Sequence, residues 1–412
     1  MLNLFKIAIR NLIRYKRRTL LTASLITIGV VFVLVFASIT GSFKSMMIGQ
    51  ITDSMLGHLQ IHRKGYVASI DNLPLNMNMK PKAYEKIAAL LAADPQVEAF
   101  SPRLKFGGMF SNFTETTNIR LNGIDPEREF RTVPLLTSRI SEGKKTLNKG
   151  EILIPALLAK GLKVKPGDPV VVVATNADGS VNGKQFVVSG ILESATGPGG
   201  RDGYLHIEDA AEVLRMSTAE ISEVAVRLKD FNRLSAAVQQ IESKVAGEVN
   251  KERRPMFEVH SWEQLSPFFN IARMIDVMTF FIKIMLIAIV LISIMNVMIM
   301  AVYERIREIG TIAAIGTLPG KIRSMFIIEG FCMGMVGAAI GDLIGSAIIL
   351  LINLIGIRFD FAQQKGLLLT TTLNPHDLLV VSVIVIVVAV AASLQPAFKA
   401  SRMEPIEALR HV

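Results

Sequence analysis

The sequence predicts a membrane protein with four transmembrane helices and a large α+β domain outside the membrane. Its 412 residues are 50% hydrophobic and only 19% charged, and their mean hydropathy is positive, at +0.43. This composition is too apolar for an ordinary soluble protein. Four apolar stretches are long enough to cross a bilayer core of about 30 Å, which needs roughly 20 helical residues. A long, more polar segment separates the first stretch from the other three.

The net charge and the single cysteine further restrict the class of protein to which the chain can belong. A formal net charge of +10 is compatible with nucleic-acid binding, but the basic residues cluster beside the apolar stretches, as the positive-inside rule describes. No nucleic-acid partner is therefore expected. Because Cys332 is the only cysteine, the external domain must be stabilised by its core, without an intrachain disulfide.

Residues 1–18 predict an amphipathic helix on the inner leaflet, because basic residues recur there every three or four positions. The uncharged run 19–43 exceeds the hydrophobic region of a signal peptide and is read as a retained membrane anchor. One face of this anchor carries an apolar stripe, which packs against lipid or a neighbouring helix or else lines a cavity for a lipid-like substrate. The stripe consists of Phe32, Phe36, Ile39 and Phe43.

Residues 44–273 alternate strand and helix patterns. Strand-like residues 59–63, a helix opened by Pro81 and a run at 97–106 form a first βαβ unit, and a second unit lies within 224–259. This order predicts a split ferredoxin-like module. The insertion between the units, about 107–220, has short strand patterns separated by turn residues, which predicts a β-rich subdomain placed away from the membrane.

Three aromatic residues precede the second membrane span. Trp262, Phe268 and Phe269 fit an interfacial aromatic belt. Phe268 and Phe269 are also further candidates for a substrate cavity.

The remaining chain predicts three more spans. They are residues 274–303, 324–356 and 377–398, joined by a charged turn at 304–323 and a loop at 357–376, with a tail at 399–412. Lys and Arg concentrate before the first span, in the turn and in the tail, so both termini and the turn are expected in the cytoplasm.

The third span contains a ladder of small residues, which lets another helix approach closely in lipid. The same span carries two acids, Glu329 and Asp342, which are costly in a membrane and are therefore functional candidates. The role of Asp342 stays open. The ladder consists of Gly330, Gly334, Gly337, Gly341 and Gly345.

Catalytic chemistry has no clear signal in the sequence. The nearest match to a phosphate-binding loop, Gly316 to Ile322, is one residue short between its glycines and lacks the Ser or Thr that holds magnesium. Energy from ATP would have to come from another chain. His58 and His62 are four apart on a predicted strand without further ligands, so no metal site is expected. No catalytic residue and no cofactor on this chain are predicted.

Several motifs together resemble a known family. They are Asn296-Val297-Met298, Glu304 to Gly310, Ala314 to Gly316, Glu329-Gly330, Gln395 to Ala400 and Pro405 to Arg410, with Asn122 to Pro126, Lys165 to Asp168 and Phe186 to Gly190 in the external domain. Over its whole length the chain is similar to the ABC-transporter permeases of the MacB, lipoprotein-releasing (LolC and LolE) and FtsX type.

This resemblance implies a porter-like module with a β-rich subdomain outside the membrane. It also implies two permease subunits, identical or paralogous, bound to two separate ATPase subunits that hold ATP and Mg. Glu304, Arg305, Arg307 and Glu308 would contact the ATPase, rather than being mere positive-inside flanks. The tight helical turn would be allowed by Gly310, Ala314 and Gly316.

The expected function is release of lipoproteins, or another amphiphile, from the outer leaflet of a bacterial inner membrane, with a possible periplasmic carrier or adaptor as a further partner. MacB proteins carry their ATPase on the same chain, whereas this sequence starts directly with the membrane helix. That departure favours the lipoprotein-releasing arrangement. Two alternatives stay open: a MacB-type tripartite efflux or peptide-export permease, and an FtsX-like activator of a cell-wall hydrolase.

Overall fold

The computed structural model describes residues 2–193, 202–249, 255–361, 364–368, 370–372 and 375–404. The chain divides into two compact units. The helical unit comprises Met1–Lys44, Arg273–Arg358 and Leu368–Val412, and the sheet unit comprises Ser45–Ala272 with Phe359–Leu367. The tail motif from Pro405 to Arg410 lies outside the described residues.

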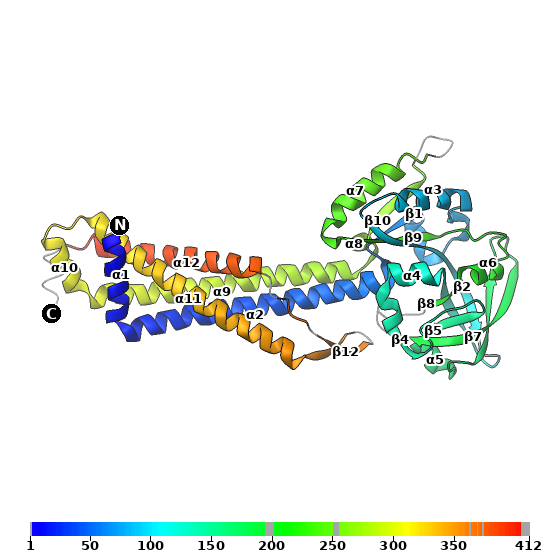
Figure 1. Cartoon of the computed structure of the whole chain (residues 1–412), viewed down its shortest axis with the longest axis horizontal. Coiled ribbons are helices and arrows are strands. Elements are labelled where there is room, and N and C mark those ends of the chain that lie inside the picture. Colours follow the sequence, from blue (N-terminus) through cyan, green and yellow to red (C-terminus); the bar gives the residue numbers. More distant parts are fainter. Residues whose placement is uncertain are drawn as a thin grey trace. The chain divides into compact units, whose positions relative to one another are not determined.

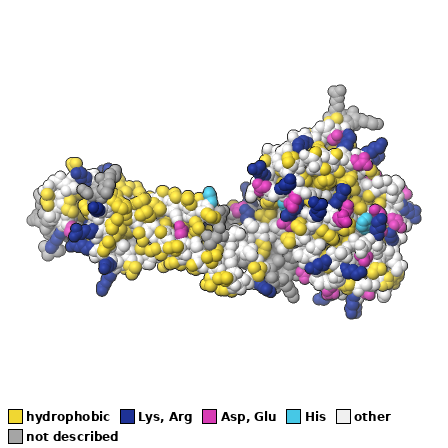
Figure 2. All heavy atoms as spheres, viewed as in Figure 1, with side chains coloured by type: hydrophobic (Ala, Val, Ile, Leu, Met, Phe, Trp, Pro, Cys, Tyr) yellow, Lys and Arg dark blue, Asp and Glu magenta, His cyan; other side chains and the backbone are white. Residues whose placement is uncertain are grey.

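Four long helices build the helical unit, and in the described residues these four are long and apolar enough to span a membrane. The mean hydropathy of their most apolar windows is 2.2 to 2.8, yet only 22% to 33% of each window is buried. Figure 2 shows hydrophobic side chains over most of this unit's visible surface. Because exposing so much apolar surface to water is unfavourable, these faces are expected to meet lipid or another membrane-spanning chain. The helices of this unit are α1 Leu2–Arg14, α2 Lys16–Ile51, α9 Phe268–Glu304, α10 Ile306–Ala314, α11 Pro319–Ile355 and α12 Pro375–Ser401 (Figure 1).

Two of these helices are longer than the predicted spans. Helix α2 continues eight residues beyond Phe43, to Ile51, and α9 begins at Phe268 rather than at residue 274. The hydropathy pattern marks only the lipid-immersed part of a helix, whereas a polar continuation without proline stays helical. Directly after Phe43, Lys44 Nζ of α2 donates to both carboxylate oxygens of Asp276 in α9, at 2.7 and 2.6 Å.

The glycine ladder of α11 contacts two different helices. A Cβ added at Gly330 or Gly334 would lie 2.7 Å from Ser393 or Ala389 of α12. On the other side, a Cβ added at Gly337, Gly341 or Gly345 would lie 2.5, 2.6 or 3.1 Å from Ile26, Val30 or Leu34 of α2. The absence of side chains at these positions lets α11 pack directly on both neighbours.

The split module has the ferredoxin-like strand order that the sequence predicts. Strands β10, β1, β9 and β2 lie side by side in that order, and all three pairings are antiparallel. Helix α3, Pro81–Ala92, connects β1 to β2, and α7, Leu234–Val245, connects β9 to β10. The strands are β1 Leu59–Arg63, β2 Val97–Ser111, β9 Glu223–Leu228 and β10 Phe257–Ser261.

The insertion does not form a separate sheet, because β2 runs through its predicted end at Phe106. Its first half pairs with β9, whereas its second half pairs with β3 and β6. Gly108 permits the closest of these approaches, since a Cβ there would lie 2.9 Å from the Val173 carbonyl oxygen. The ten strands of the sheet unit that are described here therefore form one sheet. The insertion's strands are β3 Thr116–Ile124, β4 Ile140–Gly143, β5 Glu151–Pro155, β6 Pro169–Thr175, β7 Val181–Leu192 and β8 Asp202–His206.

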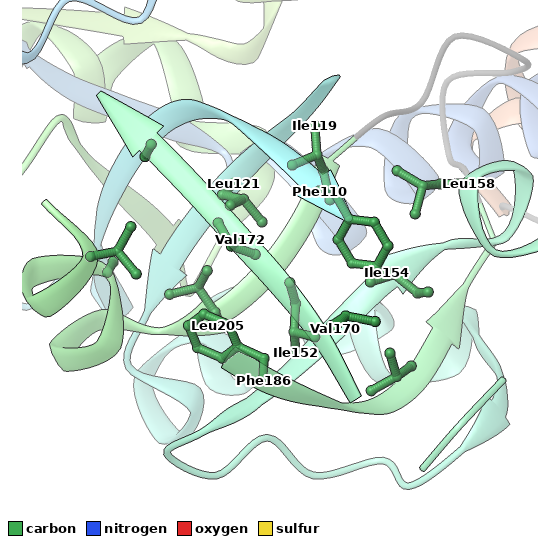
Figure 3. Packing of buried hydrophobic residues seen from close by; sticks show 14 of the residues in the cluster. Phe110, Ile119, Leu121, Ile152, Ile154, Leu158, Val170, Val172, Phe186 and Leu205 are labelled. Carbon is green, nitrogen blue, oxygen red and sulfur yellow. The ribbon is translucent and has the colours of Figure 1, made fainter. Parts of the chain in front are cut away.

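Short helices complete the sheet unit around two buried clusters. Figure 3 shows the larger one, in which Phe110, Ile152 and Phe186 are at most 1% exposed and come from three different strands. The short helices are α4 Pro126–Thr132, α5 Ala156–Leu162, α6 Ile207–Val213 and α8 Trp262–Leu265, with a π-helix at Thr52–Leu56 and 3-10 turns at Val67–Asn72, Leu75–Met77, Pro134–Arg139 and Phe231–Arg233. A hairpin, β11 Arg358–Phe361 and β12 Gln364–Leu368, follows α11.

The prediction that Trp262 belongs to an interfacial belt is wrong. Its side chain is 3% exposed within the sheet unit and packs edge-on against Phe269, with ring centroids 5.9 Å apart. An interfacial anchor must present its ring to the headgroups. Trp262 instead is the first residue of α8, between the capping-box residues Ser261 and Gln264, and is buried there.

Candidate functional site

The candidate site is the turn that joins α9, α10 and α11. Helix α9 ends at Glu304, and Arg305 adopts a non-helical conformation with φ −112° and ψ 19° before α10 starts. Gly316, with φ +93°, ends the short helix, and Pro319 opens α11 at the position where proline is best tolerated. Two chain breaks therefore hold a helix of three turns between two membrane-length helices.

Arg305 lies at the centre of a buried network in this turn. Its side chain is 4% exposed, its Nε donates to Glu308 Oε2 at 3.2 Å, and its Nη1 donates to Glu329 Oε2 at 3.4 Å. The guanidinium also lies over the ring of Tyr15, 5.5 Å from the centroid, and over that of Phe326, at 5.8 Å. A buried charge needs such partners because its desolvation is expensive.

Glu308 extends the network to the first two helices. Its Oε1 accepts a hydrogen bond from the Tyr15 hydroxyl at 3.2 Å and lies 3.6 Å from Arg14 Nη1. Tyr15 is the residue between α1 and α2. The network thus ties α10 to α11 and to the junction of α1 and α2, and Figure 1 shows α1 and α10 at the same end of the helical unit.

Two of the residues expected to contact the ATPase have partners inside the chain. Arg305 is buried, and its ion pairs are with Glu308 and Glu329. Glu308 keeps 39% of its side chain exposed, but both its carboxylate oxygens have internal partners. Of the other predicted coupling residues, Gly310 is buried, whereas the following are exposed: Glu304, Arg307, Ala314 and Gly316.

The turn also presents an apolar surface that the sequence analysis missed. Ile315 is 80% exposed and Leu318 is 65% exposed, on either side of Gly316, and Ile312 is 37% exposed. We call these three residues the turn tip. The sequence gives no signal for this surface, because only the structure shows that Ile309 is buried while Ile312, three residues later, is not. Exposed apolar residues gathered at one place mark interaction surfaces.

The six cavity candidates are divided between the two units. Phe32 is 55% exposed and Phe36, Ile39 and Phe43 are half-buried, while Phe268 and Phe269 belong to the sheet unit. The main groove of the helical unit is lined by another face of α2, which includes Leu34, Ser38 and Gly41. None of the six candidates lines it.

The two acids of α11 have separate partners. Glu329, 1% exposed, pairs with Arg305. Asp342 accepts a hydrogen bond from the Ser382 hydroxyl of α12 through Oδ2, while its Oδ1 has no hydrogen-bond partner. The two carboxylates therefore belong to different contacts.

A second ionic cluster lies inside the sheet unit. Arg103 of β2 contacts Glu129 at 2.6 Å and Glu223 at 2.9 Å, and Glu223 is also 2.8 Å from Lys105 Nζ. Burial alone would raise the pKa of Glu223, but Lys105, His62 and Arg103 together hold that pKa well below its ordinary value. Both acids are fully buried, so the cluster belongs to the core.

The histidines fit structural roles. His58 Nδ1 accepts a hydrogen bond from the Leu228 amide at 3.0 Å, and His58 Nε2 lies 3.3 Å from Asp53 Oδ1. His62 stacks on Tyr66 with centroids 5.5 Å apart. Among the described residues, no group of three or more His, Cys, Asp or Glu side chains is placed to hold a metal ion.

The fold and the site together define an integral membrane protein with a helical unit and an α+β domain. In the helical unit, the turn between α9 and α11 is interrupted twice and is held by contacts within the chain. The MacB-like periplasmic core domain matches residues 19–244, and the FtsX-like permease C-terminal domain matches residues 280–405. The chain belongs to this family of ABC-transporter permeases, the MacB, LolC and FtsX type.

Named relatives agree with this assignment. The lipoprotein-releasing system transmembrane protein LolC of Neisseria meningitidis serogroup B is 24% identical, over 95% of this chain and 94% of its own. The macrolide export ATP-binding/permease protein MacB of Nitrobacter winogradskyi is 26% identical over 63% of this chain and 38% of its own. The solved periplasmic region of MacB from Actinobacillus actinomycetemcomitans covers 53% of this chain and 92% of its own, with 13% identity and a TM-score of 0.37.

Proposed function

We propose that the chain is the permease subunit of a mechanotransmitting ABC transporter that releases lipoproteins from the outer leaflet of the inner membrane. ATP hydrolysis takes place on a separate ATPase subunit. The observation that carries the transport role is the turn between α9 and α11, which presents an exposed tip and is tied internally to three helices. Similarity to LolC over nearly the whole chain supports lipoproteins as the cargo.

In this proposal the ATPase docks on the turn tip and on the exposed charges of Glu304 and Arg307. A push on α10 reaches α11 through Arg305 and Glu329 and reaches the α1–α2 junction through Glu308 and Tyr15. The close contacts of the α11 glycines with α2 and α12 support a transfer of that motion across the membrane, since packed helices resist compression.

The proposed topology follows the distribution of Lys and Arg. Both termini and the turn are cytoplasmic, and the sheet unit is periplasmic. The working assembly contains two ATPase subunits with their ATP and Mg, and a second permease subunit that is either a copy or a paralogue. A triacylated lipoprotein is the cargo, and a periplasmic carrier receives it. Phe32, with 55% of its side chain exposed, is the member of the α2 stripe most available to an acyl chain.

Reconstitution tests the cargo. The permease and its ATPase in proteoliposomes should hydrolyse ATP faster when a triacylated lipoprotein is present, and the lipoprotein should appear on a soluble carrier. If neither effect occurs, the lipoprotein assignment is wrong. The similarity to MacB supports efflux or peptide export as the second candidate. Stimulation by an amphiphilic drug or peptide, without response to lipoprotein, would favour that candidate.

A further inference from the structure

A groove in the helical unit has no role in the proposed coupling. It has a volume of about 530 Å³ and opens between α2, α9 and α12, with one wall completed by Ile349 of α11. Its lining is apolar on the side of Leu34, Val380 and Val381 and polar on the side of α9. The charged residues that line it are Lys44, Asp276 and Lys283.

The two lysines mark the level of the groove in the membrane. Residues 284–303, which follow Lys283, contain no charged side chain. In a helix, such a run spans about 30 Å, the thickness of the hydrocarbon core. Lys44 likewise directly follows the uncharged run 19–43. Lys283 therefore lies where the hydrocarbon core ends and the phosphate groups begin, with Lys44 farther toward the water.

Among the described residues, one positive charge in the groove has no acidic partner. Lys44 is neutralised by Asp276, to which it donates at 2.7 and 2.6 Å. Lys283 is half-buried and has no ion pair or hydrogen bond to a described residue. An ammonium group at this depth without a protein partner needs an anion to offset its partial desolvation.

The walls indicate what kind of anion fits. The apolar side of the groove suits an acyl chain, and exposed residues of α9 continue this surface toward the lipid: Met278 is 54%, Phe280 59% and Phe281 63% exposed. A free inorganic anion would leave these walls unused. Basic pockets between transmembrane helices bind anionic lipid headgroups in this way.

We propose that this groove is a binding site for an anionic phospholipid such as phosphatidylglycerol. Lys283 pairs with the phosphate, the hydroxyl-bearing side around Ser38 and Thr279 faces the headgroup, and one acyl chain lies along Leu34 and Val381. The site is contained in one subunit and needs only the membrane insertion of the chain. It does not depend on which cargo the transporter moves.

Lipid retention tests this site in the full-length protein. The chain is reconstituted in vesicles with equal parts of phosphatidylglycerol and phosphatidylethanolamine, then extracted and weighed by native mass spectrometry. The wild type should retain one phosphatidylglycerol per chain. Lys283→Gln should lower that retention about tenfold or more, as expected from the loss of one charge-assisted hydrogen bond.

Arg273→Gln is the matched control. It removes the same charge from the same end of α9, but Arg273 is exposed and does not line the groove. Retention should stay as in the wild type. An equal loss in both variants would show a general attraction to the headgroup region and would overturn the site, as would a wild type that retains no phosphatidylglycerol.

A second variant tests the groove without changing charge. A Cβ at Gly41 would meet no atom within 4 Å, so Gly41→Leu is accommodated by filling the groove. It should also reduce retention of phosphatidylglycerol. Full retention in Gly41→Leu would overturn the placement of the lipid in this groove. If millimolar inorganic phosphate displaces the lipid from the wild type, the site recognises free phosphate and the lipid assignment is wrong.

Discussion

The role inferred for Arg305 from the sequence differs from the role that the structure shows. In the sequence it belongs to a charged cytoplasmic flank, which is normally solvated. In the fold its guanidinium is enclosed by Tyr15, Phe326 and two glutamates. Glu329 lies 24 positions later, on another helix, so no local spacing rule links the pair. Arg305 holds the turn in place only because α10 packs against α11.

Arg305→Gln should therefore destabilise the helical unit. It leaves Glu329 buried without its cation, which typically costs about 3–5 kcal/mol. The sole cysteine, Cys332, lies one turn after Glu329 on α11 and is 3% exposed. A thiol-reactive dye therefore reports the unfolding of this region. The dye should react at a clearly lower temperature in the variant, whereas the exposed Arg307→Gln should shift the midpoint little.

The double variant Arg305→Gln with Glu329→Gln separates the effect of the buried charges on stability from the effect of side-chain shape. Removing both buried charges should restore part of the lost thermal stability, because the uncompensated carboxylate is then gone. If the double variant is as unstable as the sum of both single variants, the two side chains do not interact and the network is not what holds the turn.

Glu223 gives the sheet unit an acid-side pH dependence. Because its pKa is lowered in the folded state, its contribution to stability is complete above the ordinary glutamate pKa and is lost as pH falls through the folded value. Fluorescence of Trp262, the sole tryptophan, follows this unit. We expect the wild type to lose stability progressively below about pH 4.5. Glu223→Gln should be less stable at neutral pH and should show a flatter acid profile.

At the scale of elements, the turn was predictable as a charged break between two apolar spans, but its surface was not. Ile309 and Ile312 are three residues apart, a spacing that places them on the same side of a helix, yet Ile309 is buried whereas Ile312 and Ile315 are exposed. Which apolar residues a helix buries depends on its neighbours, and here Tyr15 and Glu329 come from α1–α2 and α11. From the sequence we therefore assigned ATPase docking to the charged residues of the turn and did not predict the apolar turn tip.

Ile315→Asp and Leu318→Asp should weaken binding of the ATPase. Burial of one such side chain contributes about 1.5–3 kcal/mol, which corresponds to roughly tenfold to hundredfold in affinity for each residue. Binding to the detergent-solubilised permease by interferometry measures the loss. Val181→Asp is the control, because Val181 is also 61% exposed but lies on β7. Unchanged affinity in both tip variants would contradict docking at this place.

At the scale of the whole molecule, the four spans and the split module followed from patterns that are local in sequence. Apolar runs marked the spans, and the order of strand and helix signals marked the two βαβ halves. The union of module and insertion in one sheet was not predictable. It depends on β2 continuing through Gly107 and Gly108, and a glycine pair in a strand-like run equally suggests an end. The continuation of β2 is fixed by its pairing with β6, which joins residues 60 to 66 positions apart in the sequence.

This shared strand predicts that module and insertion unfold together. Gly108→Val places a Cβ 2.9 Å from the Val173 carbonyl oxygen, within the insertion's part of the sheet. Overpacking of this kind costs about 1–3 kcal/mol. Trp262 lies at the module's end of the sheet, next to β10, yet its fluorescence transition should move to lower temperature. Gly107→Val, where a Cβ meets nothing within 4 Å, is the neighbouring control. If Gly108→Val leaves the Trp262 transition in place, the insertion unfolds as an independent domain and the single sheet does not act as one cooperative body.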